Sequence, residues 1–295
     1  MENQFFRTIS IMDGVTAIAG LGGELAYLVE GDERALLIDG LAGVGSLKAF
    51  VRDVTHLPVV VALTHGHIDH NGAAYEYGEC YIHPRDAAML HPGTKMGSSV
   101  HCSPDTRLDY VTNGHGRGDN VRDVSAADVV SNRPVRAYPI FEGDVFDLGG
   151  GVLIEVAELP GHTAGSVVFI DRSRHVAYTG DACSRSTVLG ARTVLEYKEA
   201  LEGFFTRHGD DFDACFGGHS TDPVPKSIFP QAVALCDRIL QGRDDRIPTE
   251  HRGRPRLVAL ARGKNLQPAD GSFCNIVYSP EKVHGRSPKR VILPL

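Results

Sequence analysis

The densest group of metal-binding side chains in this sequence is a His-x-His-x-Asp-His motif at 65–70. It directly follows an apolar, β-branched run at 59–63, a pattern typical of a strand covered on both faces. Zinc and iron are bound in proteins by neutral imidazole and carboxylate, and a loop at a strand end can bring several short side chains to one point. We therefore interpret the motif as a metal-binding loop rather than a merely polar one. Its candidate ligands are His65, His67, Asp69 and His70.

Three further donors lie downstream, each after an apolar run and beside glycine. His162 lies in a glycine-bounded turn, Asp181 follows the run at 176–178 and Thr-Gly, and His219 follows two glycines. Glycine lets the backbone pass close to a bound group. Taken alone, each donor is more typical of a turn than of a ligand. Together with the first motif they supply five histidines and two aspartates, enough for two adjacent cations.

Such a pair of cations predicts hydrolytic chemistry. Two divalent ions that share one water lower its pKa from near 16 toward neutrality, so that a hydroxide forms at physiological pH. That hydroxide attacks an ester-like, thioester-like or amide-like carbonyl, or a phosphorus or sulfur centre, while the second ion stabilises the developing charge. Asp69 would lie beside the nucleophile and orient it or carry protons, so we predict it as the catalytic residue.

In order and context, these motifs resemble the metallo-β-lactamase-fold hydrolases, over about residues 26–219. The resemblance implies an α/β fold, a four-layer αβ/βα sandwich in which two mixed sheets pack face to face with helices outside and the metals at one edge. It implies that Asp181 bridges two ions, and that Asp39 supports the site without binding metal, although an Asp-Gly turn explains Asp39 at least as well. The implied ligands are His65, His67 and His162 for the first ion and Asp69, His70 and His219 for the second.

The elements expected to position these donors alternate between strand and helix on both sides of residue 135. This alternation predicts two similar α/β halves within a single domain spanning 1–295. Strands are predicted at 26–29, 35–39, 59–63, 80–82, 152–156, 166–170, 176–178, 214–216, 257–260 and 273–278, and helices from 46 and at 85–90, 197–206 and 226–240.

One long segment, at about 93–134, lacks this pattern and is rich in Gly, Ser, Asn, Asp and Arg. Such an insertion is usually functional or merely mobile, which leaves a lid or a partner-contact arm as open interpretations. If it folds over the metals, some of its side chains contact substrate. The candidates are His101, Cys102, Arg107, Tyr110 and His115.

Composition narrows the class of protein. The 295 residues include 37 acidic and 30 basic side chains, for a net charge of −7, so nucleic-acid binding is not expected. No apolar run is long enough to cross a bilayer, and the first residues carry no export signal. Six widely spaced cysteines indicate reduced thiols and a cytoplasmic protein. We expect a small-molecule substrate, no nucleic-acid or membrane partner, and leave a homodimer open.

The function predicted from these observations is a metallo-hydrolase that uses a metal-bound hydroxide on an ester, lactone, thioester or similar bond. Two divalent ions are expected, Zn²⁺ first, with Fe and Mn as alternatives. A thioesterase of the glyoxalase II kind is disfavoured. That type of enzyme would add a helical substrate domain, whereas the tail after His219 indicates one helix and two strands. The alternatives are a mononuclear iron persulfide dioxygenase of the same fold, and phosphodiesterase or β-lactamase activity.

Overall fold

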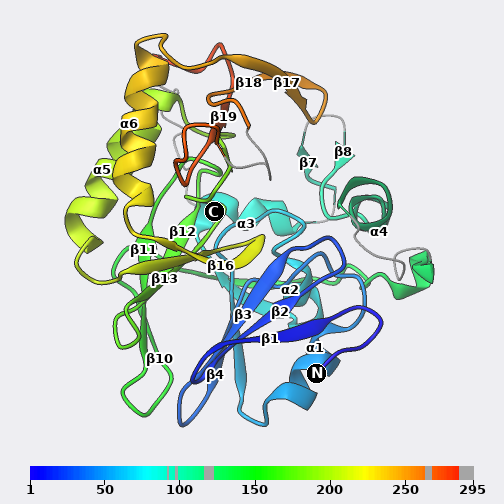
Figure 1. Cartoon of the computed structure of the whole chain (residues 1–295). Helices are drawn as coiled ribbons and strands as arrows, with labels where there is room; N and C mark the ends of the chain where they lie inside the picture. Colours follow the sequence, from blue (N-terminus) through cyan, green and yellow to red (C-terminus); the bar gives the residue numbers. More distant parts are fainter. Residues whose placement is uncertain (92, 97–98, 116–122, 263–267, 286–295) are drawn as a thin grey trace.

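Two β-sheets pack face to face, and helices cover their outer faces (Figure 1). The computed structural model describes residues 1–91, 93–96, 99–115, 123–262 and 268–285. This arrangement confirms the predicted four-layer αβ/βα sandwich. The two sheets carry the donors of the N-terminal and C-terminal halves respectively, so the packing of the halves brings the two groups of donors together.

The first sheet has seven strands and contains the predicted hairpin of 26–29 and 35–39. β3 and β4 are apolar and buried along almost their whole length because the sheet is covered on both faces. β4, β5, β6 and β9 run parallel, so their carboxyl ends lie at one edge. In sheet order the strands are β1 (Arg7–Met12), β2 (Val15–Ala19), β3 (Leu25–Glu30), β4 (Ala35–Ile38), β5 (Val59–Ala62), β6 (Glu79–Ile82) and β9 (Arg136–Pro139).

The second sheet has six strands and confirms the predicted strands near 152–156, 166–170, 176–178 and 214–216. β13 and β15 are parallel neighbours, which places the residues after them, including Asp181 and His219, at the same edge. In sheet order the strands are β10 (Val145–Asp147), β11 (Leu153–Glu158), β12 (Val167–Asp171), β13 (Val176–Gly180), β15 (Ala214–Gly217) and β16 (Ser220–Pro225).

The helices bury one apolar face each against a sheet. The predicted Ser46 cap is confirmed, since its Oγ accepts a hydrogen bond from the Ala49 N–H at 3.2 Å. Thr193 and Glu196 form a capping box at the start of α5. The helices are α1 (Leu47–Val54), α2 (Gly72–Tyr77), α3 (Pro84–Ala87) with η1 (Ala88–Leu90), α5 (Val194–His208) and α6 (Ile228–Leu240).

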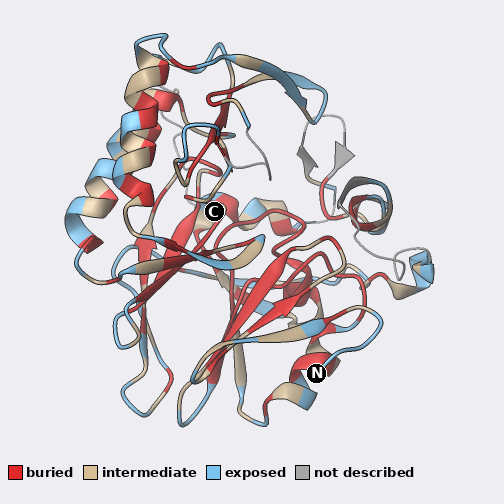
Figure 2. Ribbon diagram, viewed as in Figure 1, coloured by how far each residue is buried: buried red, intermediate tan, exposed pale blue. Residues whose placement is uncertain are grey.

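The core consists of three main layers of buried side chains. Figure 2 colours the buried residues red along the ribbon. One layer lies between the two sheets and includes Tyr27, Tyr178 and Phe216. A second lies between the first sheet and helices α1 and α2, around Phe50. A third lies between the second sheet and helices α5 and α6, around Phe204. Burial of this apolar surface holds the edge that carries the donors in a fixed position.

The C-terminal segment differs from the prediction of two strands. A third sheet has the order β14 (Thr187–Val188), β19 (Ile276–Tyr278), β18 (Arg254–Val258) and β17 (Ile247–His251). β17 escaped prediction because its IPTEH sequence contains proline and lacks a run of large apolar residues. Among the described residues, no helix combines the length and apolar character needed to cross a bilayer.

The insertion at 93–134 is partly regular where it is described. Its elements are β7 (Lys95–Met96), β8 (Ser99–Val100), α4 (Pro104–Asp109), the π-helical turn η2 (Tyr110–His115) and the 3₁₀ turn η4 (Ala126–Asp128). The Ser103 hydroxyl caps α4 by accepting from the Thr106 N–H at 3.1 Å. The insertion packs a small apolar cluster, including Val111 and Val129, against Ile68 and Tyr75 beside the 65–70 motif.

Candidate metal centre

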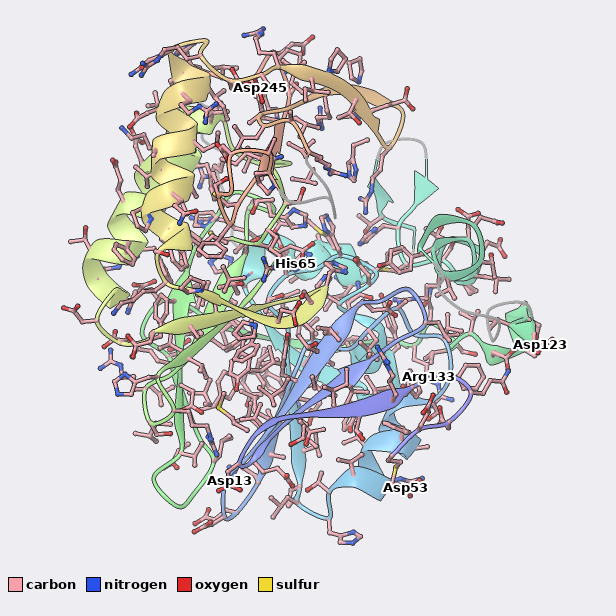
Figure 3. The ribbon with its side chains drawn as sticks, viewed as in Figure 1. Asp13, Asp53, His65, Asp123, Arg133 and Asp245 are labelled. Atoms are coloured by element: carbon pink, nitrogen blue, oxygen red, sulfur yellow. The ribbon has the colours of Figure 1, made fainter. Side chains whose placement is uncertain are left out.

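All seven predicted ligands meet at one edge of the sandwich, between the two sheets. The 65–70 motif follows β5, His162 lies between β11 and β12, Asp181 follows β13, and His219 lies in the turn between β15 and β16. In Figure 3, His65 is labelled in the interior of the molecule, where the two halves meet. Six of the seven side chains are largely buried, whereas the His219 side chain is 40% exposed. His219 therefore marks the open side of the centre.

The first group of donors is formed by three histidine rings. Nδ1 of His67 lies 3.1 Å from Nε2 of His65 and 2.8 Å from Nε2 of His162. Ligand nitrogens about 2.0–2.1 Å from a tetrahedral zinc ion are separated by about 3.3 Å, so this spacing is close to that of a bound set. The three rings fit one cation.

The second group contains Asp69, His70 and His219. Oδ2 of Asp69 lies 3.6 Å from Nε2 of His70 and 3.5 Å from Nε2 of His219. Asp181 lies between the two groups: its Oδ2 is 3.5 Å from Nε2 of His162, and its Oδ1 is 3.3 Å from Nε2 of His219. The geometry agrees with a carboxylate shared by two ions. His65, His70 and Asp181 also form a compact group, so the two sets adjoin directly.

Hydrogen bonds outside the centre fix which ring nitrogens face it. Nδ1 of His162 lies 2.8 Å from the Val188 carbonyl oxygen, and Nδ1 of His70 lies 2.8 Å from Oδ2 of Asp39. Each contact turns Nε2 toward the other donors, where its lone pair is available once the ring is neutral. Within the described part of the chain, His70 Nε2 and Asp181 Oδ1 are buried without any hydrogen-bond partner. Buried polar atoms are nearly always partnered, so these two atoms fit a metal ion.

Charge differs between the two groups of donors. Burial lowers the pKa values of His65 and His67 well below 6.5, and neighbouring histidines add to the shift, so both rings are neutral at pH 7. Burial also disfavours charge on His70, but the carboxylates of Asp39, Asp69 and Asp181 outweigh it and raise its pKa to about 10. Although burial opposes charge on His219 as well, Asp181 and Asp69 raise its pKa to about 8. The second group must therefore lose protons when it binds a cation.

Asp39 supports the centre and also shapes a turn. Its backbone has a φ of +67°, which is uncommon for a residue with a side chain. Its carboxylate accepts hydrogen bonds from the Thr64 N–H and hydroxyl, both at 2.8 Å, in addition to its contact with His70. The carboxylate thus orients His70 and fixes the start of the motif, as the resemblance implied. The turn and the supporting role are two consequences of one conformation.

Four of the five insertion residues singled out from the sequence contact the 65–70 motif or its neighbours. His101 Nε2 lies 3.0 Å from the Gly66 carbonyl oxygen, and the Tyr110 hydroxyl donates to Oδ2 of Asp69 at 3.2 Å. Arg107 is fully buried and donates to the carbonyls of Ala42 and Ile68 and to Oδ1 of Asn71. The amide of Asn71 also donates to the Cys102 sulfur at 3.0 Å. The side chain of His115 lies outside the described residues.

Sequence reasoning missed two buried carboxylates. Asp86 accepts hydrogen bonds from the backbone N–H groups of Gly66 and Gly165 and from the Thr163 hydroxyl, at 2.6–3.1 Å, and so joins the motif to the His162 turn. Glu24 is buried near Asp69 and His219, and burial raises its pKa. Neither belongs to a local motif, and only their three-dimensional neighbours reveal them.

This fold and donor set define a class of metal-binding αβ/βα sandwich proteins. A profile of the metallo-beta-lactamase superfamily matches residues 19–215, more than half of the chain, and the chain belongs to that superfamily. The match includes six of the seven donors and ends just before His219. The predicted family is confirmed.

Individual relatives are distant. The acyl-coenzyme A thioesterase MBLAC2 of Gallus gallus is 31% identical over 164 residues, which is 52% of this chain and 56% of that protein. The chain thus spans little more than half the length of that relative. The uncharacterized protein Rv2581c of Mycobacterium tuberculosis is 27% identical over 247 residues, covering 79% and 90%. The metallo-beta-lactamase family protein TTHA1429 from Thermus thermophilus has a TM-score of 0.54 at 17% identity, covering 79% and 82%.

Proposed function

We propose that this chain is a metal-dependent hydrolase of small carboxylic thioesters or esters. In this proposal two ions are bound and Asp181 bridges them. The first ion is bound by His65, His67 and His162, and the second by Asp69, His70 and His219. The single observation that carries the proposal is the convergence of seven donors whose ligand atoms adjoin within overlapping groups. Both ligand sets are complete, which favours two ions over one. The thioesterase relatives favour a thioester among the predicted substrates.

Two divalent cations bound there would lower the pKa of a shared water and polarise the scissile carbonyl. The chain's own residues supply position and proton control. Asp39 holds the His70 ring by its Nδ1, and the Val188 carbonyl holds His162 in the same way. Asp86 keeps the 65–70 motif and the His162 turn at a fixed separation. These contacts preorganise the donors before any ion binds.

Asp69 is the residue we assign to proton transfer. One of its oxygens accepts from the Tyr110 hydroxyl at 3.2 Å, so this hydrogen bond fixes the direction of the carboxylate. Burial alone would raise the pKa of Asp69, but His70 and His219 lower it below its usual range, so the carboxylate is ionised at neutral pH. An ionised, oriented carboxylate can accept a hydrogen bond from the attacking water.

We also propose a cellular setting and a kind of substrate. All six cysteines are free and buried, which supports a reducing compartment and therefore the cytoplasm. A small-molecule substrate is supported by the enclosed position of the donors.

The test is a hydrolysis screen of the zinc-loaded protein with acyl thioesters, the matched oxygen esters and a lactone. We expect turnover of at least one of them, and a loss of about 10³-fold or more in His67→Ala, because a first-group ligand is removed. His175→Ala is the matched control, since His175 is 61% exposed and pairs only with Asp213 in the contacts described. Equal turnover by His67→Ala and the wild type would refute the proposal.

A further inference from the structure

The β17–β18 hairpin concentrates positive charge in an acidic protein. Its twelve residues, 247–258, contain Arg252, Arg254, Arg256 and His251 but only one carboxylate, Glu250. The whole chain carries a net charge of −7. The hairpin also lies beyond residue 215, where the match to the superfamily profile ends. The charge therefore lies outside the region that the superfamily profile matches.

Strand register places most of this charge on one face. His251 pairs with Arg254 and Thr249 pairs with Arg256, and paired residues share a face of the hairpin. Glu250 pairs with Pro255, so it lies on the opposite face. No carboxylate of the hairpin therefore neutralises the two arginines from their own face.

Arg256 has an unsatisfied nitrogen in its guanidinium group. Its Nε is buried and has no hydrogen-bond partner in the described structure, while its Nη1 donates to the neighbouring Pro255 carbonyl oxygen at 3.3 Å. Burial lowers the pKa of this guanidinium, and the like charge of Arg254 adds to the shift. Two adjacent guanidiniums without a carboxylate partner are unfavourable in the free protein, and an anion that accepts from both would relieve the repulsion.

A cavity of about 250 Å³ lies against the hairpin and is lined in part by Thr249, the strand partner of Arg256. It is lined by Ile247, Pro248, Thr249, Val258, Leu260 and Arg262. Ile247 and Val258 form the next pair on the face that carries Arg256, so apolar surface and guanidinium lie side by side. The volume is below that of most whole-ligand pockets, but it suits one ring of a larger ligand.

The tip of the hairpin is a tight turn. The backbone turns at Arg252 and Gly253, with φ values of +52° and +70°, the two-residue turn that matches strand twist. Figure 1 shows the hairpin across the top of the molecule, and Figure 3 labels His65 below it.

We propose that the β17–β18 hairpin binds the phosphates of a nucleotide-bearing thiol, such as coenzyme A, when that thiol is the leaving group of the substrate. Arg254 and Arg256 receive the phosphates, the cavity receives the heterocycle, and the turn at Arg252 leads toward the thioester. Arginine suits this role because its planar fork donates two parallel hydrogen bonds to one phosphate. The inference rests on the proposed function and specifies its substrate class.

Binding is tested separately from catalysis with 3′-phosphoadenosine 5′-diphosphate, which has no thioester to hydrolyse. Isothermal titration of the full chain should show binding that weakens as salt is raised to about 0.5 M. The Arg254→Gln/Arg256→Gln double variant should bind about tenfold more weakly or worse. The matched control Arg34→Gln, at the turn before β4 in the first sheet, should bind like the wild type. No binding by the wild type, or equal affinity of the double variant, would overturn the proposal.

Catalysis then tests the link to the metal centre. For an acyl-coenzyme A, the double variant should lose about tenfold in kcat/KM, mostly through KM, because the arginines do not touch the scissile bond. For the same acyl group on N-acetylcysteamine, which lacks phosphates, its kcat/KM should match the wild type. Equal losses on both substrates would contradict the proposal. If neither thioester is hydrolysed but binding of the nucleotide still requires the two arginines, the proposed function is wrong and the anion site is supported.

A second variant covers the case in which the double substitution prevents folding. Arg252→Asn removes the positive charge at the tip of the hairpin, and asparagine tolerates the positive φ of this turn position. We expect an unchanged thermal midpoint and a rise in KM for the acyl-coenzyme A alone. An unchanged KM for that substrate would contradict the proposed path from the hairpin to the metal centre.

Discussion

Arg107 provides a sharp test of how the insertion supports the metal centre. This side chain comes from α4, is fully buried, and lies over the Tyr75 ring at 4.9 Å. Its guanidinium donates at 2.6 Å to the Ala42 carbonyl, at 3.1 Å to that of Ile68, and at 2.6 Å to Oδ1 of Asn71. Two of these acceptors belong to the loop that carries Asp69 and His70. Substitution Arg107→Met keeps much of the volume but removes every one of these donors.

The expected loss in the free energy of unfolding follows from the three acceptors that lose their hydrogen-bond donor. Each buried, unsatisfied acceptor costs about 1–3 kcal/mol, so three of them give an upper range near 9 kcal/mol. Two effects reduce this cost. Water enters beside the smaller side chain, and the second lone pair of each carbonyl oxygen accepts another hydrogen bond. We expect a loss of about 3–5 kcal/mol in the free energy of unfolding. For a chain of this size that is a fall of about 5–8 °C in Tm.

The assay is urea unfolding of the zinc-free and zinc-loaded proteins, followed by zinc analysis. Arg107→Met should also weaken zinc binding about tenfold or more, because the loop behind Asp69 and His70 loses its support. Arg34→Met is the matched control: Arg34 is exposed and pairs with Glu33 at 3.4 Å, so its loss should cost less than about 0.5 kcal/mol. An Arg107→Met variant as stable as that control, with wild-type zinc affinity, would refute the reasoning.

Four further results are expected. Asp39→Asn should lower zinc affinity about 10–100-fold with little change in fold, as measured by chelator competition, because His70 loses the carboxylate that orients it; unchanged affinity would count against that role. Asp86→Ala should lower the urea midpoint and also the zinc content, since two backbone N–H groups and the Thr163 hydroxyl lose their acceptor; a stable variant with full zinc would contradict the bridging role. In the zinc-free protein the raised pKa of His70, about 10 against 6.5 when unfolded, adds stability that is complete below pH 6.5 and disappears as the pH rises toward 10. Binding at the second group should accordingly release protons from His70 and His219 near pH 7, measurable by calorimetry in buffers of different ionisation enthalpy, and absence of release would show the assignment wrong.

Much of the donor set was visible in the sequence because it is local. Four of the seven donors lie within six residues after one strand, and such clustering is rare outside metal sites. The remaining three donors stood out by their places after apolar runs and beside glycine, and the resemblance assigned them to particular ions. The structure brings their side chains to the same edge. Strands with continuous apolar runs, such as β4 and β12, were equally visible, since burial on both faces leaves a plain pattern.

The supporting contacts were not visible, because they join residues far apart in the chain. Asp86 contacts Gly66 and Gly165, which lie 20 and 79 positions away, and no spacing rule connects them. Arg107 was noticed only as a member of an irregular segment and interpreted as a possible substrate contact, whereas it is buried beneath the 65–70 motif. The β17 strand was missed because its residues are mostly polar and exposed, so alternation of apolar and polar residues is absent.

The central claim is that seven side chains jointly hold two cations, and anomalous diffraction from crystals of the zinc-loaded protein tests it most directly. We predict two peaks, one among His65, His67 and His162 and the other among Asp69, His70 and His219, with Asp181 in contact with both. A stoichiometrically loaded crystal whose zinc lies elsewhere, with these side chains bonded only to one another, would contradict the account.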